Sequence, residues 1–479
     1  MKTLIKKSHL AIAALSALAI TACGVGGGLA GIGGSGYIST GTVTSFGSVF
    51  VNGVEFETGS STFEIEDASG TQADLRIGMV VEVTGSINGD GITGNATHIK
   101  YGDDLQGPVT DLVAGANTSR FRIFGNEVEV SEVSTAFEDV TFATIAKDNV
   151  LEVSGFYDQN NVLQASYIAF ISANANEDSI VEIKGRISNL SLDRSDFVIQ
   201  GVNVNATSAI LEDLPDGLQE NLFVEVKGKL NDNVIDAIEI ESEDSFSEDA
   251  DVDVELEGIV TRYNDKTDFD VNNQTVDATN AILSPVTLVL KAGDKVEIKG
   301  QLSNGVFIAS EVETRQGSAG VSAIVSEVNI DTNSFTVEVL PDQFITVQLT
   351  TATRMKDDKG EEGEDENLLI TELNADVDFV SVQGFESALD TTGDTITATE
   401  VKRESEVKAT ELEGIVTAGS VNDFTVLGVT YPVNISTSYN GVTDNAALVL
   451  LIEGQVETVI TISDETPADG FLDSVEIDE

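Results

Sequence analysis

The seven residues Phe50-Val51-Asn52-Gly53-Val54-Glu55-Phe56 decide the fold class, because they read as one complete β-hairpin. Apolar and polar residues alternate in Val54-Glu55-Phe56 after the Asn52-Gly53 turn, which is typical of a strand with one buried face. Asn-Gly supplies the positive φ angles that a two-residue hairpin turn demands. The recurrent phenylalanines of such hairpins are predicted to form the cores of repeated units. An aromatic strand followed by a turn recurs at Phe121–Gly125, Phe197–Gly201, Phe269–Asn273, Phe335–Val337 and Phe424–Gly428.

Each hairpin lies between two further motifs, so the repeated unit has three parts. A glycine that opens an alternating strand comes first: Gly41-Thr42-Val43, Gly107-Pro108-Val109, Gly185-Arg186-Ile187, Gly258-Ile259-Val260, a degenerate Ala323-Ile324-Val325, and Gly414-Ile415-Val416. A strand that ends in glycine comes last, followed by a partner strand: Val81–Gly85 with Ala96–Ile99, Leu151–Gly155 with Ala165–Ile168, Val224–Gly228 with Ala237–Ile240, Val296–Gly300 with Ala309–Val312, Val380–Gly384 with Ala398–Val401, and Leu450–Gly454 with Leu472–Val475.

These patterns predict an all-β chain, built as a tandem array of about six small barrels with about five or six strands each. A unit this small closes its edges best as a barrel. The strand count, with a connection in the middle of the unit, resembles a Greek-key barrel of the OB type. A six-stranded split barrel and a short β-sandwich are the alternatives.

Polar or small residues interrupt the strand pattern and set the predicted bounds. We expect a signal peptide at residues 1–22 and a glycine-rich tether at 23–39. The units are expected at 40–104, 105–174, 180–244, 253–315, 320–404 and 410–479, and the fifth carries an acidic insertion at 356–367. Six such globules in a row could reach about 170 Å if extended.

The opening glycine, the phenylalanine hairpin and the Val-Glu-Val-x-Gly strand together resemble the tandem domain-of-unknown-function 5666 repeats of bacterial lipoproteins. The resemblance covers nearly all of residues 40–479. It is clearest in the first, third and fourth units and weakest in the fifth, where Ala323 replaces the opening glycine. The family has no settled activity, so the resemblance implies no catalytic residues.

The N-terminus predicts export and lipidation. Three lysines, an apolar run from Leu10 to Ile20 and small residues before Cys23 form a secretory signal too short to span a bilayer. Ile20-Thr21-Ala22-Cys23 resembles the bacterial lipobox, and Cys23 is the only cysteine, so it is the predicted acylation site. Gly24 follows instead of the aspartate that retains lipoproteins in the inner membrane, which implies an outer-membrane anchor on an undetermined face. Each buried methylene of the acyl chains would add roughly 0.8 kcal/mol to the free energy of membrane binding.

Charge restricts the possible partners. The net charge of −57 becomes −60 when Lys2, Lys6 and Lys7 are removed with the signal. Such a chain repels nucleic acid and anionic lipid headgroups. Adaptation to salty surroundings explains the same acidity without any ligand. A single cysteine excludes an internal disulfide.

Catalytic constellations are hard to assemble from these residues, so we predict that the protein is not an enzyme. His98 is the one histidine outside the signal, and it lies on an alternating strand where it should point away from Ile99 into solvent. No serine has the setting of a nucleophile elbow. A glycosidase-like carboxylate pair would need a cleft lined by aromatic residues, and the chain has no tryptophan.

Calcium is the one ion that the composition suggests, since hard cations prefer carboxylate and carbonyl oxygens in loops. Two acidic stretches qualify, although neither matches an EF-hand loop: Glu243–Glu257, and the insertion with Asp357, Asp358, Glu361, Glu362, Glu364, Asp365 and Glu366. Solvated acidic loops without an ion are the alternative.

Our leading hypothesis is a non-enzymatic lipoprotein of the envelope or cell surface, whose repeats bind a protein or polysaccharide or act as a spacer. A calcium-responsive adhesive or structural protein is the second hypothesis. A polysaccharide-acting hydrolase is the third.

Overall fold

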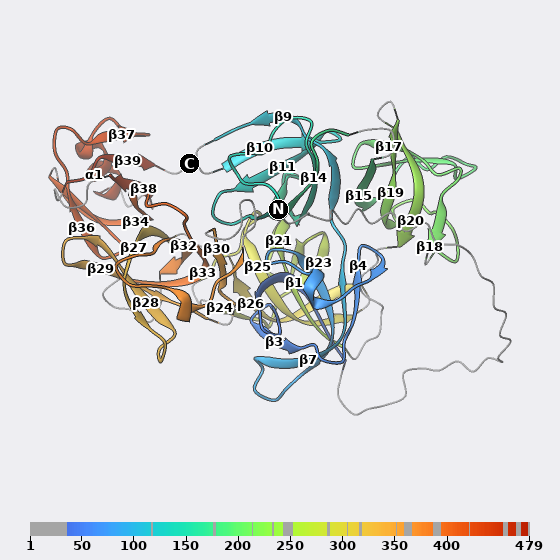
Figure 1. Cartoon of the computed structure of the whole chain (residues 1–479), viewed down its shortest axis with the longest axis horizontal. Helices are drawn as coiled ribbons and strands as arrows, with labels where there is room; N and C mark the ends of the chain where they lie inside the picture. Colours follow the sequence, from blue (N-terminus) through green and yellow to red (C-terminus); the bar gives the residue numbers. More distant parts are fainter. Residues whose placement is uncertain are drawn as a thin grey trace, which may run out of the picture. The chain divides into compact units, whose positions relative to one another are not determined.

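The computed structural model describes residues 36–477 (Figure 1), apart from residues 116–117, 176–178, 213, 232–233, 243–251, 285–287, 304, 316–318, 351, 359–365, 387–393, 421, 454–457 and 466–470. The predicted signal peptide, Cys23 and nearly all of the tether lie outside this part of the chain. The described residues are mostly β, as predicted. Their strands form six units, which we number from the N-terminus: unit 1 (37–101), unit 2 (105–172), unit 3 (180–242), unit 4 (253–314), unit 5 (319–403) and unit 6 (410–477).

Unit 1 is a closed five-stranded barrel. Its strands pair in the order β1-β2-β3-β7-β6 and back to β1, so the sheet closes on itself. Both β3 and β4 run parallel to β7, and the other neighbours are antiparallel. The strands of unit 1 are β1 (Tyr37–Phe46), β2 (Val49–Val51), β3 (Val54–Glu57), β4 (Thr62–Ile65), β5 (Ala68–Ser69), β6 (Val80–Ile87) and β7 (Thr93–Tyr101), and η1 (Gln72–Asp74) is a 3-10 turn.

The same order of pairing recurs in units 2 to 4. The first strand of unit 2 is divided at Val109 into β8 and β9, and a single bridge, Ser188 to Val198, joins the first two strands of unit 3. Unit 2 contains β8 (Leu105–Pro108), β9 (Thr110–Val113), β10 (Thr118–Ile123), β11 (Asn126–Ser131), β12 (Ala136–Glu138), β13 (Val150–Tyr157) and β14 (Leu163–Ser172). Unit 3 contains β15 (Ile180–Arg186), β16 (Asp196–Ile199), β17 (Val202–Asn205), β18 (Ile210–Glu212), β19 (Phe223–Asn231) and β20 (Val234–Ser242). Unit 4 contains β21 (Asp253–Asp265), β22 (Asp268–Val271), β23 (Gln274–Asp277), β24 (Ile282–Ser284), β25 (Lys295–Ser303) and β26 (Val306–Thr314).

Unit 5 repeats the closed order, β27-β28-β29-β33-β32, whereas the pairings described for unit 6 leave β36 and β39 unjoined. Unit 5 contains β27 (Ala319–Asn329), β28 (Ser334–Leu340), β29 (Gln343–Gln348), β30 (Arg354–Asp357), β31 (Glu366–Asn367), η2 (Ile370–Glu372), β32 (Phe379–Glu386) and β33 (Thr395–Arg403). Unit 6 contains β34 (Thr410–Ser420), β35 (Asp423–Val426), β36 (Val429–Pro432), β37 (Ser438–Asn440), α1 (Asn445–Glu453), β38 (Val459–Asp464) and β39 (Ser474–Ile477).

The predicted strand Leu450–Gly454 is wrong, because Asn445–Glu453 forms α1. The run of alanine and leucine favours a helix, and the Asp444 carboxylate accepts the Ala447 N–H at 2.9 Å as an N-cap. The place of the predicted strand beside β34 is taken by β38, in which Val459, Ile460, Thr461 and Ile462 are all β-branched.

The recurrent glycines have two different steric reasons. A Cβ on the opening glycine Gly258 would lie 2.3 Å from Oδ1 of Asn272, the turn residue of its hairpin, and the opening glycines of units 1, 2, 3 and 6 meet their own turn residues in the same way. A Cβ on Gly300 would lie 2.1 Å from the backbone oxygen of Ile308, where the β25–β26 register shifts by a bulge. The strand-ending glycine is therefore a bulge residue.

Five of the six recurrent phenylalanines are buried in the cores, but Phe50 is half-buried. The turn of unit 1 begins at Asn52, so the position equivalent to the other phenylalanines is Val49. Val49 pairs with Phe56, which brings the aromatic side chain into the core from the opposite strand.

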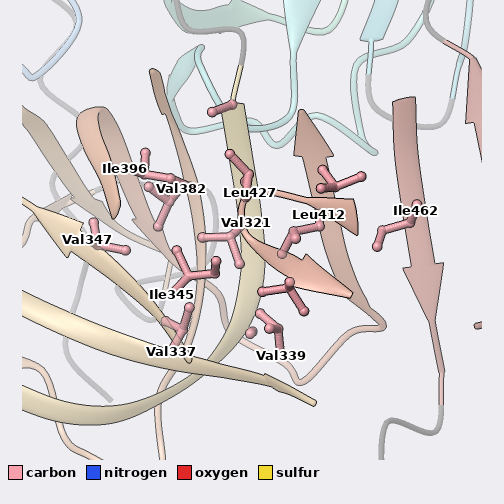
Figure 2. Close-up of a cluster of buried hydrophobic side chains, with 14 of the residues drawn as sticks. Val321, Val337, Val339, Ile345, Val347, Val382, Ile396, Leu412, Leu427 and Ile462 are labelled. Carbon is pink, nitrogen blue, oxygen red and sulfur yellow. The ribbon is translucent and has the colours of Figure 1, made fainter. Parts of the chain in front are cut away.

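The units are joined in pairs through their first strands. Strand β1 pairs in parallel with β21, β8 pairs with β15, and β27 pairs with β34, which links units 1 and 4, 2 and 3, and 5 and 6. Figure 2 shows the continuous core of units 5 and 6, in which Val321 of β27 and Leu412 of β34 belong to one cluster. Sequence neighbours are therefore not always structural partners.

The junction of units 1 and 4 contains a buried polar network. Tyr37 of β1 donates its hydroxyl proton to Glu255 of β21, and Ser39 Oγ lies 3.2 Å from the same carboxylate oxygen. Lys299 Nζ lies 3.0 Å from Glu255 and 3.2 Å from Glu297. Burial and the negative charge of Glu297 raise the pKa of Glu255 to about 8.

Candidate functional site

A cavity of about 700 Å³ lies among residues of units 1, 2, 4, 5 and 6. Hydroxyl, amide and charged side chains form much of its lining, together with a few apolar groups such as Phe156 and Val382. Unit 2 contributes the turn that follows β11 and residues of β13 and β14, and units 4, 5 and 6 contribute mostly strand residues. The cavity therefore depends on how the units pair and is not a property of one barrel.

The ionised groups of the cavity wall are largely paired with one another. Lys295 Nζ lies 2.7 Å from Glu257 and 5.2 Å from the centre of the Phe156 ring. Glu257 also accepts the backbone N–H of Thr42 at 2.6 Å. Burial alone would raise the pKa of Glu257, but Lys295 and this hydrogen bond lower it to about 2. This carboxylate is therefore ionised and fixed, and it is not a candidate general acid.

Arg354 anchors the opposite part of the wall. Its guanidinium donates to the backbone oxygens of Ser134 and Ser166 and lies 2.8 Å from Glu400. Lys408 lies 2.8 Å from Glu132 and so links the segment between β33 and β34 to unit 2. These side-chain contacts join units 2 and 5 at the cavity wall.

The overall charge of the lining is negative. It contains seven carboxylates, from Glu129, Glu132, Asp158, Glu257, Glu400, Glu411 and Glu413, against four basic side chains, from Lys295, Arg315, Arg354 and Lys408. Burial raises the pKa of Glu411. The cavity is thus suited to neutral polar groups, and anions would be repelled.

The predicted calcium residues are only partly described. Asp357 is buried and accepts hydrogen bonds from both Nε, at 2.9 Å, and Nη2 of Arg403, and Asp358 lies 3.5 Å from Lys402. Four others, Glu361, Glu362, Glu364 and Asp365, lie outside the described residues, and only the backbone of Glu366 is described, in β31. Calcium binding at the insertion stays a prediction, with Asp357 already engaged by Arg403.

The second acidic stretch, Glu243–Glu257, has its first part outside the described residues. At its end, Glu255 and Glu257 are ion-paired with lysines of β25. His98 is half-exposed, with Nδ1 2.8 Å from Thr62 Oγ1, while Ile99 is fully buried. The prediction that His98 points away from Ile99 is confirmed.

The family of the repeats follows from comparison with known domains. The model of a domain of unknown function, DUF5666, matches residues 36–100, 106–169, 184–241 and 257–313, which together make up more than half of the chain. The chain belongs to the DUF5666 family. The four DUF5666 matches overlap units 1 to 4, so the repeats shown by the family number four and not six. No curated protein matches the chain. Within the described residues, no helix is long and apolar enough to cross a membrane.

Sequence reasoning missed the recurrent lysine beside the buried glutamates of the DUF5666 units; in unit 3, Lys227 reaches Glu66 and Asp67 of unit 1. A signal was present, because the motif Val-Glu-Ile/Val-Lys-Gly occurs three times, at Val181–Gly185, Val224–Gly228 and Val296–Gly300. Its glutamate and lysine point out of the barrel, yet Glu182, Glu225 and Glu297 are all buried. In so acidic a chain, a recurrent lysine marks a surface that another unit covers.

Proposed function

We propose that this DUF5666 chain is a lipid-anchored envelope protein without catalytic activity, whose units bind a neutral polysaccharide. The cavity of about 700 Å³ carries the binding part of the proposal, because it offers many hydroxyl, amide and carboxylate groups to a ligand rich in hydroxyls. Its negative charge disfavours anionic polymers and nucleic acid. The pairing of unit 1 with unit 4 favours a binding role over that of an extended spacer.

We also infer that all six units share one OB-like architecture. Units 5 and 6 lie outside the matched segments, but unit 5 has the closed strand order of unit 1 and unit 6 has most of it. In every unit a short fourth strand runs parallel to the last long strand. Domain bounds near residues 40, 105, 180, 253, 320 and 410 are part of this proposal.

The binding proposal is tested by titrating neutral and anionic oligosaccharides of envelope type into the full chain. Ala352 lines the cavity and is half-buried, so Ala352→Trp should fill the space and weaken binding at least tenfold. Ala173→Trp, at an exposed site outside the lining, is the matched control. Binding that survives in Ala352→Trp would refute the site, and shortened oligosaccharide products would favour the hydrolase alternative.

The anchor is tested independently. Cells expressing the chain should incorporate labelled palmitate into it and retain it in the outer-membrane fraction, since Gly24 is not an inner-membrane retention residue. Cys23→Ser should abolish both results. Unlabelled, freely released wild-type protein would contradict the lipoprotein assignment.

A further inference from the structure

A second polar cluster is buried where units 1, 2 and 3 meet, and none of its residues lines the cavity. It contains two lysines, Lys184 and Lys227, and six carboxylates, from Glu66, Asp67, Asp103, Glu152, Glu182 and Glu225. Two positive charges cannot balance six negative ones. The cluster therefore needs either protons or a further cation.

The two lysines are engaged on the side of unit 3. Lys184 Nζ lies 3.0 Å from Glu225, and Lys227 Nζ lies 3.0 Å from Glu225 and 3.5 Å from both Glu182 and Glu66. Lys227 also donates to Asp67. Burial alone would raise the pKa of Glu225, but the two ammonium groups outweigh it and lower that pKa. Most of the available positive charge is thus used by four carboxylates, those of Glu225, Glu182, Asp67 and Glu66.

Glycine at position 102 makes room for this arrangement. A Cβ there would lie 2.9 Å from Lys184 Nζ and 3.3 Å from Glu225 Oε2, so a side chain would displace the ion pair. The close approach also sets the next residue, Asp103, inside the cluster.

Three carboxylates converge on the other side of the cluster. Glu66 belongs to the β4–β5 turn, Asp103 to the connection between β7 and β8, and Glu152 to β13. One oxygen of each lies within 4.8 Å of the others. Glu66 accepts the Asp103 backbone N–H at 2.9 Å, and Glu152 accepts the hydroxyl proton of Tyr101 at 2.6 Å.

Asp103 is the decisive residue. Its side chain is completely buried, and neither carboxylate oxygen has a hydrogen-bond partner. An ionised carboxylate in that position is strongly destabilising unless a cation accompanies it. Its two free oxygens are what a metal ligand requires.

We propose that Glu66, Asp103 and Glu152 bind a hard divalent cation of the calcium and magnesium class. Carboxylate oxygens are the preferred ligands of both ions. Two ligands of one ion lie at most twice the ion–oxygen distance apart, which is about 4.6–5.2 Å for calcium and about 4.0–4.2 Å for magnesium. Oxygens that all lie within 4.8 Å of one another are close enough to share one such ion. The bound ion joins unit 1, its connection to unit 2, and unit 2 itself.

The pKa values of the three proposed ligands agree with a cluster that has too little positive charge. Burial raises the pKa of Glu66 and of Asp103, and raises that of Glu152 to about 7. A neighbouring acidic group, Glu64, Asp67 and Glu241, differs in its exposure and its partners, although burial also raises the pKa of Glu241 to about 7. Its members are half-exposed, and Lys100 lies 3.7 Å from Glu64 and 3.2 Å from Glu241. With Lys227 beside Asp67, each carboxylate of that group has a lysine partner.

The test is thermal unfolding of the full chain in chelator, in calcium chloride and in magnesium chloride, with calorimetric titration of each salt. Asp103→Asn keeps the shape of the side chain and removes its charge, and Glu64→Gln is the matched control outside the site. At calcium 100-fold above its Kd we expect the unfolding temperature of the wild type and of Glu64→Gln to rise by roughly 5 °C. The rise and one tight binding event should be absent from Asp103→Asn.

Asp103→Asn should also unfold no earlier than the wild type in chelator, because it removes an unpaired buried charge. This result separates loss of the ion from loss of folding, and Glu152→Gln serves as the second variant. A response to magnesium alone would support the site and change the ion. An equal response in Asp103→Asn, or no response of the wild type to either salt, would overturn the proposal, and the latter would mean that the cluster is protonated.

Discussion

The packing of the opening glycine against the hairpin turn predicts a specific rescue in unit 4. A methyl group at Gly258 would lie 2.3 Å from Oδ1 and 2.4 Å from Cγ of Asn272, so the asparagine side chain must leave. It would then lose the hydrogen bond from Ile259 N–H, at 3.0 Å, and the one to Glu257 oxygen, also at 3.0 Å. Each is worth about 1 kcal/mol, and overpacking adds about 1–3 kcal/mol. We expect Gly258→Ala to destabilise unit 4 by about 3–5 kcal/mol.

Asn272→Gly removes the obstacle and the same two hydrogen bonds, while glycine accepts the φ of 47° at this turn. Alone it should cost about 2 kcal/mol. The double variant should cost little more than this single change, which gives a coupling of about 2 kcal/mol or more between the two sites. Additive effects would refute the assignment of the opening glycine to turn packing.

Hydrogen-exchange mass spectrometry of the full chain is the suitable assay, because it reports on residues 253–277 separately from the other units. Gly89→Ala is the control, since no atom lies within 4 Å of the Cβ it would add. Protection in its own peptide should stay unchanged.

Three further outcomes follow from buried groups. Gly300→Ala should destabilise β25 and β26 by at least about 3 kcal/mol, as measured by hydrogen exchange of residues 295–314. No side-chain deletion should restore the stability, because the obstacle is the Ile308 backbone oxygen. The folded state binds a proton at Glu255 more tightly than the unfolded state, so the unfolding temperature should fall as pH rises from about 5 to about 8. The fall should be smaller in Glu255→Gln, and equal slopes in the two proteins would contradict this role of Glu255. Arg354→Met should lower stability by about 3 kcal/mol because Glu400 is left buried beside it, and adding Glu400→Gln should recover part of the loss in a melting experiment.

The strands and hairpins could be predicted because their signals are local. Asn52 and Gly53 have φ angles of 52° and 77°, which are those of the two-residue turn that Asn-Gly indicates. The helix α1 was not predicted because Leu450–Gly454 matches the sequence motif of the strand that ends in glycine. Helix propensity and the Asp444 cap decided the outcome there.

The joining of units could not be predicted, because it depends on the outward faces of the barrels. Glu255 and Glu257 alternate with apolar residues and look solvent-exposed in sequence, but unit 1 covers them. Alternation shows which side of a strand faces its own core, and it does not show whether a neighbour covers the other side. Both the cavity and the Asp103 cluster lie on such covered faces. The sequence pattern therefore indicated the acidic loops as metal sites and did not indicate either of these two.

The parallel pairing of β1 with β21 has a consequence for folding during the proposed export. A chain exported from its N-terminus presents unit 1 first. The hydrogen bond from Ser39 to Glu255 cannot form until Glu255, 216 residues further along, has emerged. During that interval the outer edge of Tyr37–Thr40 lacks its strand partner, and an open edge can pair with another chain. The order of emergence therefore differs from the order in which contacts are completed. Under the proposed export, the rate of translocation and the help of chaperones should influence the yield of folded protein.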